Sequence, residues 1–191
     1  MPDEQKLSES TYHAVINAPM ERVDIAGWLF NLPEAEYQRC APPDHIAAGY
    51  TTTDDGRPMS INVEQIGDGL VVQHYVGEVV GPHHCRMVSL SDVYTPQGRT
   101  KVRVIWELSV KPIDEGRCEY TNSVVALTTA EFLDFIDLHS ITLQQAAATR
   151  QVASADHNSR ETPLFAQSIE RRALAGVTTP VAAVQAVAGG S

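Results

Sequence analysis

Residues 100–110 alternate strictly between apolar and polar side chains. Five even positions are apolar, whereas most odd positions are charged or polar. A strand with this pattern has one covered face and one face in water, which is typical of an antiparallel sheet. Other short β-prone segments lie between Gly, Pro and Asp turn signals. The expected strands are residues 10–17, 60–66, 70–80, 85–94, 100–110 and 118–127.

Helical patterns flank these strands. Residues 20–32 carry apolar side chains at helical spacing, and a weaker helix is expected at 34–40. Thr128 and Glu131 fit a capping box that begins a long helical segment, in which Pro163 is expected to cause a kink or a restart. Because the strands cluster between helices, we predict an α+β fold. The simplest arrangement is a helix grip, a curved antiparallel sheet wrapped around a long C-terminal helix with an internal cavity.

Composition sets the class of protein. A chain of 191 residues with 43% hydrophobic content predicts one globular domain with its own core. The formal charge of −10 disfavours nucleic acid and anionic membrane surfaces as partners. No apolar run reaches the roughly 20 residues of a membrane span, and no signal segment is visible. We therefore expect a cytoplasmic protein with three reduced, buried cysteines.

The two ends differ from the middle in composition. Residues 1–9 are polar and are expected to form a flexible leader, and residues 176–191 are rich in Ala, Val and Gly and are expected to form a flexible tail. The single helix-grip domain is then residues 10–175. The Val/Ala run of the tail could pack on a second copy, so a homodimer is kept as an alternative.

The element order, with a first strand that ends in Asn17-Ala18-Pro19, resembles the helix-grip fold of the START-like, or SRPBCC, superfamily, which includes the Bet v 1-like proteins. The opening segment HAVINAPMERVDIAGWLFNLPE is similar to the usual start of these domains. The resemblance covers roughly residues 10–174 and implies a cavity for a small hydrophobic, often aromatic, molecule. The superfamily includes lipid and hormone carriers, polyketide cyclases and aromatases, ring-hydroxylase subunits and hydrolases, so the fold does not identify the ligand.

His157 and Glu161 lie four residues apart in the long helical segment. A continuous helix places them on one face. Such a pair supplies two metal ligands, or a histidine oriented by a carboxylate for acid–base catalysis. The alternative is an exposed pair that only stabilises the helix.

His74 and Glu78 share one face of the strand expected at residues 70–80. If this face is the inward one, His74 and Glu78 form a polar spot that binds a ligand in an otherwise apolar pocket. Both faces of this strand are equally apolar, so the inward face is open, and a solvent-facing pair is the alternative. A branch of the superfamily, the phloretin and diacetylphloroglucinol hydrolases, uses zinc held by His and Glu to cleave a carbon–carbon bond. That resemblance implies that His74, Glu78, His157 and Glu161 bind one divalent ion.

Three further residues are candidates for ligand binding. Trp106 has the clearest inward assignment, and its indole N–H could serve a ligand or simply lie in the core. Tyr120 and Asn122 share a face of the last strand. If that face is covered, they need hydrogen-bond partners, from the chain or from a ligand.

No GxSxG, P-loop, GxGxxG or HExxH motif is present, so serine nucleophiles and nucleotide binding have no support. We expect first an enzyme with no required cofactor, in which His157, oriented by Glu161, moves a proton. Its reaction would be of the cyclase, dehydratase or lyase type, on an aromatic or polyketide-like substrate. One alternative is a non-catalytic carrier or sensor of a hydrophobic ligand. The other is a hydrolase that uses a divalent metal, such as zinc, held by His and Glu.

Overall fold

A seven-stranded antiparallel sheet and one long helix make up most of the computed structural model, which describes residues 4–176. The strands are β1 (Lys6–Ile16), β2 (His45–Thr52), β3 (Pro58–Ile66), β4 (Gly69–Val80), β5 (His84–Thr95), β6 (Gly98–Asp114) and β7 (Arg117–Leu127). The helices are the 3-10 turn η1 (Met20–Arg22), α1 (Ile25–Leu29), α2 (Glu34–Cys40), α3 (Ala130–Leu138) and α4 (Leu143–Ala175). The predicted α+β helix-grip fold is confirmed.

The sheet order is β1-β7-β6-β5-β4-β3-β2, so successive hairpins run from β2 to β7 and the first strand closes beside the last. The predicted alternation of β6 is confirmed, because its even positions from Val102 to Val110 are buried while the odd positions between them are only partly buried. One face of the sheet therefore carries the core.

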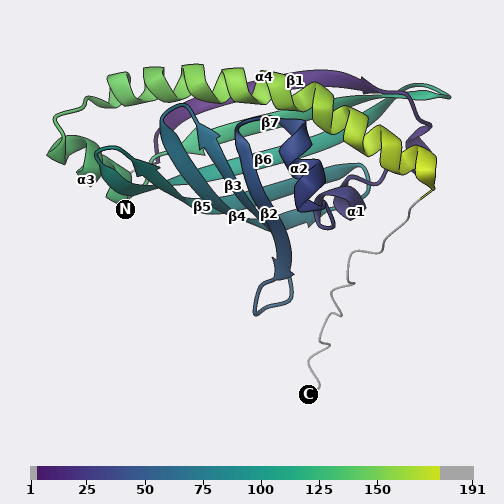
Figure 1. The fold of residues 1–191 in the computed structure, drawn as a ribbon, viewed down its shortest axis with the longest axis horizontal. Helices are drawn as coiled ribbons and strands as arrows, with labels where there is room; N and C mark the ends of the chain where they lie inside the picture. Colours follow the sequence, from purple (N-terminus) through teal and green to yellow (C-terminus); the bar gives the residue numbers. More distant parts are fainter. Residues whose placement is uncertain (1–3, 177–191) are drawn as a thin grey trace.

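Helix α4 runs along the length of the sheet, with α3 near one of its ends and α1 and α2 near the other (Figure 1). It packs mainly against β1, with smaller contacts to α2 and β7, and α2 in turn contacts β2. Phe165 of α4 is fully buried and contacts the rings of Trp28 and Trp106. The buried face of one helix thus meets the covered face of the sheet. Among residues 4–176, no helix is both long and apolar enough to cross a bilayer.

The chain enters the sheet earlier than expected. Strand β1 begins at Lys6, which pairs with Leu127, and the backbones of Gln5 and Thr128 are hydrogen-bonded. Residues 6–9 therefore belong to the fold rather than to a leader. The expected tail falls almost wholly on residues 177–191, which lie outside the described residues.

Strand β2 was not expected. Ala47, Ala48 and Gly49 are weak strand formers, and most of its side chains are exposed or half-buried. It forms because it lies at the edge of the sheet and pairs along its length with β3. An edge strand of this kind carries little hydrophobic pattern for sequence analysis to detect.

The helix boundaries also differ in detail. The expected helix at 20–32 is split, because the side chain of Asp24 accepts a hydrogen bond from Gly27 N and restarts the chain as α1. The cap of α3 is Thr129, which accepts a hydrogen bond from Phe132 N, so the capping box expected at Thr128 and Glu131 is not formed. The expected long helical segment is divided into α3 and α4, and a capping box at Thr142 begins α4. Pro163 lies inside α4, which continues to Ala175.

Gly77 lies where the pairing of β4 with β5 is irregular, and its backbone is crowded. A Cβ atom there would lie 2.6 Å from Val80 Cγ2 and 3.3 Å from Phe30 Cζ, whereas a Cβ at Gly49 of β2 would meet nothing within 4 Å. We expect Gly77→Ala to cost about 1–3 kcal/mol and to lower the melting temperature by roughly 3–10 °C. Gly49→Ala is the matched control and should leave the melting temperature nearly unchanged. Equal melting temperatures in a thermal scan would contradict the packing described here.

Candidate functional site

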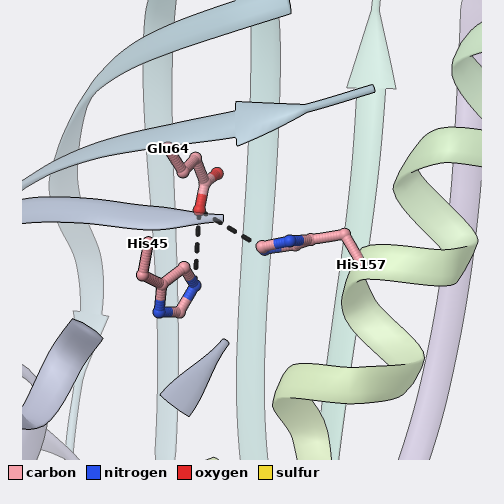
Figure 2. Close-up of side chains that lie close together, drawn as sticks. All are labelled: His45, Glu64 and His157. Atoms are coloured by element: carbon pink, nitrogen blue, oxygen red, sulfur yellow. Dashed lines mark ion pairs between the residues drawn. The ribbon is translucent and has the colours of Figure 1, made fainter. Parts of the chain in front are cut away.

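Three buried side chains from distant parts of the chain point toward one another between the sheet and α4. Figure 2 shows His45 at the start of β2, Glu64 on β3 and His157 on α4. Each offers one ligand atom, and these three atoms lie within 4.8 Å of one another. Glu161, one turn after His157, adds a fourth buried side chain.

The imidazole nitrogens and carboxylate oxygens that face one another have the spacing of metal ligands. The Nε2 atom of His45 lies 3.6 Å from Glu64 Oε2 and 3.2 Å from Glu161 Oε2. The Nε2 atom of His157 lies 3.4 Å from each of the same two oxygens. Two ligands bound tetrahedrally at about 2.0–2.2 Å from one ion would lie roughly 3.3–3.6 Å apart. These four distances are of the size expected for ligands of one divalent ion. His45, Glu64 and His157 form the group whose ligand atoms all lie close to one another, and Glu161 lies beside its two histidines.

The outer nitrogens of both histidines are held by acceptors. His45 Nδ1 donates to the carbonyl oxygen of Tyr37 at 2.7 Å, and His157 Nδ1 donates to the carboxylate of Asp44 at 2.9 Å. With the Nδ1 protons engaged in this way, each neutral imidazole presents its Nε2 lone pair to the cluster. His157 Nε2 has no hydrogen-bond partner among the described residues. Metal-binding histidines are oriented by the same kind of outer contact.

The two carboxylates are also held from outside. The hydroxyl of Tyr37 donates to Glu64 Oε2 at 2.9 Å. The amide of Asn122 donates to Glu161 Oε1 at 3.0 Å, and the indole of Trp106 donates to Asn122 Oδ1 at 2.8 Å. This chain of contacts fixes Glu161 so that its other oxygen, Oε2, faces the histidines.

Charge is concentrated in this buried space. Burial lowers the pKa of His157, but the carboxylates of Glu161 and Glu64 outweigh that effect and raise it to about 11. Burial raises the pKa of Glu161, but His157 and His45 outweigh that effect and lower it to about 2. Two buried carboxylates thus require nearby positive charge, which either protons on the histidines or a bound cation can supply.

The structure places the sequence-predicted residues in two separate groups. His157 and Glu161 are buried on the face of α4 that meets the sheet. His74 and Glu78 are exposed on the opposite face of the sheet, where Glu78 pairs with Arg86. The predicted set of His74, Glu78, His157 and Glu161 is therefore not assembled.

The reason lies in the alternation of β4. Its odd residues face the core, as the buried side chains of Val71, Gln73 and Tyr75 show. The even residues, which include His74, must then face outward. The places expected for His74 and Glu78 are taken by His45 and Glu64, from the two neighbouring strands at the edge of the sheet.

Of the five residues expected to bind a ligand, His74 and Glu78 face outward, whereas Trp106, Tyr120 and Asn122 face the core. Trp106 lines a small cavity beside the cluster, while Asn122 supports Glu161. Tyr120 is fully buried, and its hydroxyl has no hydrogen-bond partner among residues 4–176. It lines none of the cavities described here.

Sequence reasoning missed His45 and Glu64. His45 has no partner near it in sequence, and Glu64 lies on a strand whose apolar Ile61 and Val63 face away from the core. A signal was nevertheless present, because Ser60, Asn62 and Glu64 form a polar stripe at every second position. All three are buried.

One cavity adjoins the cluster and a second lies next to the first. The smaller, about 30 Å³ in which the centre of a water molecule can lie, is lined by Glu64, His157 and Glu161 together with Gln73, Tyr75 and Arg150. It has room for roughly one or two water molecules. The larger, about 330 Å³ on the same measure, lies beyond Arg150 and Ile66, which line both cavities. Its size suits a small organic ligand.

Comparisons with known proteins bear on the fold. No protein-family model matches the chain, and no curated protein matches it in sequence. Zhui aromatase/cyclase from Streptomyces sp. R1128 has a similar structure, with a TM-score of 0.63 and 12% identity over 89% of this chain and 96% of that chain. A START superfamily protein from Mycobacterium smegmatis has a TM-score of 0.47 at 12% identity, covering 87% and 97% of the two chains. Norcoclaurine synthase from Thalictrum flavum has a TM-score of 0.46 at 13% identity, covering 90% and 87%.

At such low identity, the likeness to the aromatase/cyclase concerns the fold alone. It agrees with the element order and with the grip of the sheet on α4. The chain therefore has a helix-grip fold, which it shares with this aromatase/cyclase.

Proposed function

We propose that the chain is a divalent-metal-dependent hydrolase, with zinc as the expected ion, that cleaves a carbon–carbon bond in a small aromatic or polyketide-like ketone. The observation that carries the proposal is the convergence of two imidazole nitrogens and two carboxylate oxygens, with four donor–donor distances of 3.2–3.6 Å. The resemblance to the phloretin and diacetylphloroglucinol hydrolases implied the same ligand types, although from different strand residues.

The residues fit a divalent ion in charge and in chemistry. Two carboxylates and two neutral imidazoles carry two negative charges, which one divalent cation balances. Mixed nitrogen and oxygen ligands suit zinc, and they also suit iron or manganese. The holding residues would be His45, Glu64, His157 and Glu161, with Asp44 behind His157.

A divalent ion in such a site supplies a Lewis acid for a carbonyl oxygen and lowers the pKa of a water molecule toward neutrality. The chain's own residues supply the rest. Burial, with a further contribution from Glu64, raises the pKa of Tyr75 well above its usual value, so Tyr75 keeps its proton. Its hydroxyl accepts a hydrogen bond from Gln73 Nε2 at 2.9 Å and can donate to a ligand oxygen in the small cavity. The side chains of Trp106 and Phe165 close the same cavity with apolar surface.

The proposed reaction is a hydrolysis with a simple balance. The bond between an acyl carbon and a ring carbon breaks. The hydroxyl of water ends on the acyl carbon, which leaves as a carboxylic acid, and a proton ends on the ring carbon. No oxidant or reductant is consumed.

Acid–base catalysis by His157 alone receives less support. A pKa of about 11 keeps this imidazole protonated at neutral pH, whereas a general base works best with a pKa near the working pH. Its Nδ1 is also oriented by Asp44 rather than by Glu161. A carrier without catalysis is the second candidate, because the larger cavity alone can hold a ligand.

The first prediction from the proposed function concerns metal content. Protein purified without chelator should hold about one divalent ion per chain, as measured by mass spectrometry of the metal. Glu161→Gln removes one ligand charge and should abolish stoichiometric binding. Glu78→Gln, the same change on the outer face, is the matched control and should retain it. Absence of any stoichiometric ion in the wild-type protein, even after incubation with zinc, would overturn the proposal.

The second prediction concerns pH. In metal-free protein the pKa of His157 is raised above its usual 6.5 to about 11, so its stabilising contribution is complete below pH 6.5 and is lost as pH rises toward 11. Metal binding instead requires the histidines to lose protons, so zinc affinity should increase with pH. We expect the gain in melting temperature on adding zinc to widen from pH 6 to pH 8. A gain that shrinks over this range would mean that the histidines are not ligands.

The third prediction concerns catalysis. Zinc-loaded protein should release a carboxylic acid from phloretin or diacetylphloroglucinol. Chromatography measures the acid that is released. Tyr75→Phe should lower kcat by about a hundredfold, the size expected for loss of a proton donor, with metal content unchanged. Tyr94→Phe, on the exposed face of β5, is the matched control. If the metal-loaded protein cleaves no acylphenol, carbon–carbon cleavage is excluded while the metal centre stands.

A further inference from the structure

The larger cavity lies between α3, the first turns of α4 and the neighbouring ends of β5 and β6. Most of its lining is apolar and includes Leu7, Val93, Val102, Phe132, Phe135 and Ile136. Gln145 and Thr149 of α4 also line it and are exposed, so the cavity reaches the surface on that side. A cavity of this kind suits an apolar ring system that enters from solvent.

Two charged side chains line this cavity, Asp68, which is exposed, and Arg150 of α4, which also lines the smaller cavity. The Nε atom of Arg150 is buried and has no hydrogen-bond partner among residues 4–176. Within residues 4–176 Arg150 forms no ion pair, although the negative charge of Glu64 acts to raise the pKa of its guanidinium. Burial, the largest effect, lowers the pKa of its guanidinium. The Arg150 side chain is half-buried as a whole, and Nε is its one nitrogen that is buried without a partner among the described residues. A charged group that is partly removed from water without a direct anionic partner is unfavourable, and an anion that enters the cavity reduces that penalty.

A second polar atom in the same cavity is also unpaired. The hydroxyl oxygen of Thr100, on β6, is buried and has no hydrogen-bond partner in the part of the chain that the structure describes. Buried polar groups in folded proteins are nearly always hydrogen-bonded to protein or water. The lining of one cavity thus contains two unpaired polar side chains among apolar ones, which is the pattern of a small-molecule site.

Arg150 also has a fixed relation to the candidate metal ligands. It precedes His157 by two turns of α4, about 10.5 Å along the helix axis, so both residues occupy the same face of the helix. Because Arg150 lines both cavities, a ligand group bound to it lies at their junction. A molecule held there can keep its apolar body in the larger cavity and direct its other end toward the metal ligands.

We propose that the larger cavity binds an apolar, ring-containing molecule with an anionic oxygen group, a carboxylate or a phenolate, and that Arg150 is the residue that binds this group. The planar guanidinium can donate two parallel hydrogen bonds to the two oxygens of a carboxylate, or a charge-assisted hydrogen bond to the single oxygen of a phenolate. The metal-dependent function is needed only to say which end of the molecule reacts. Binding itself is independent of it.

Two matched dyes test the charge preference. 8-Anilinonaphthalene-1-sulfonate is an apolar, two-ring-system anion, and N-phenyl-1-naphthylamine is the same skeleton without the sulfonate. Fluorescence titrations are run on metal-free protein and repeated with zinc. We expect the wild-type protein to bind the anionic dye, and Arg150→Met to weaken that binding by about ten- to a hundredfold. Binding of the neutral dye should stay the same or tighten. Arg150→Lys should retain part of the preference for the anion.

Two tryptophan substitutions test the location. Ala146 lines the cavity, whereas Ala148, on the same helix, is exposed and does not. Ala146→Trp should weaken the binding of both dyes, because the new ring fills the cavity, and Ala148→Trp should leave both unchanged. Circular dichroism and a thermal scan establish that each variant is folded.

The outcomes separate this proposal from the metal-dependent function. An unchanged ratio of anionic to neutral dye affinity in folded Arg150→Met overturns the role of Arg150. Dye binding that Ala146→Trp does not affect overturns the cavity as its location. If these dye results hold but no metal binds, the ligand site stands and the hydrolase proposal fails. If metal binds but the ratio of anionic to neutral dye affinity is unchanged in Arg150→Met, the hydrolase proposal stands and the ligand-site proposal fails.

Discussion

The burial of a charged stripe on α4 is the constraint on which the rest of the structure depends. His157 and Glu161 lie on the same helix as the fully buried Phe165, so packing the apolar part of the helix against the sheet also removes two charged groups from water. Such groups are tolerated in a core only when partners surround them. The chain supplies these partners from β2, β3 and β7.

Much of the fold was predictable because its signals are local. Alternation along residues 100–110 identified β6, and turn residues separated most of the other strands. A helix without Gly over many turns identified α4. Strand β2 was missed because an edge strand of small residues has neither alternation nor a hydrophobic face. The start of β1 was missed because its first residues are polar and are ordered only by pairing with β7.

The candidate site was half predictable for a related reason. Helical spacing puts His157 and Glu161 together, and that relation is visible within five letters of sequence. The other half depends on tertiary contacts, because His45 meets Glu161 across 116 positions of sequence. For residues 70–80, both faces are apolar, so the pattern alone could not choose the inward one. Outer contacts such as that of Asp44 with His157 carry no sequence signature at all.

The edge position of β2 has a consequence for association between molecules. Its first residue, His45, is joined to α4 through Glu161, while most of the strand hydrogen-bonds on one side only, to β3. An ion shared by β2 and α4 would tether this edge to the body of the molecule and close a very long loop, which restricts partial opening. Without the tether, the open side of β2 is freer to pair with the edge of another molecule, which is the usual route from exposed strands to aggregation. Loss of the ion would then appear first as reduced colloidal stability of the protein rather than as global unfolding.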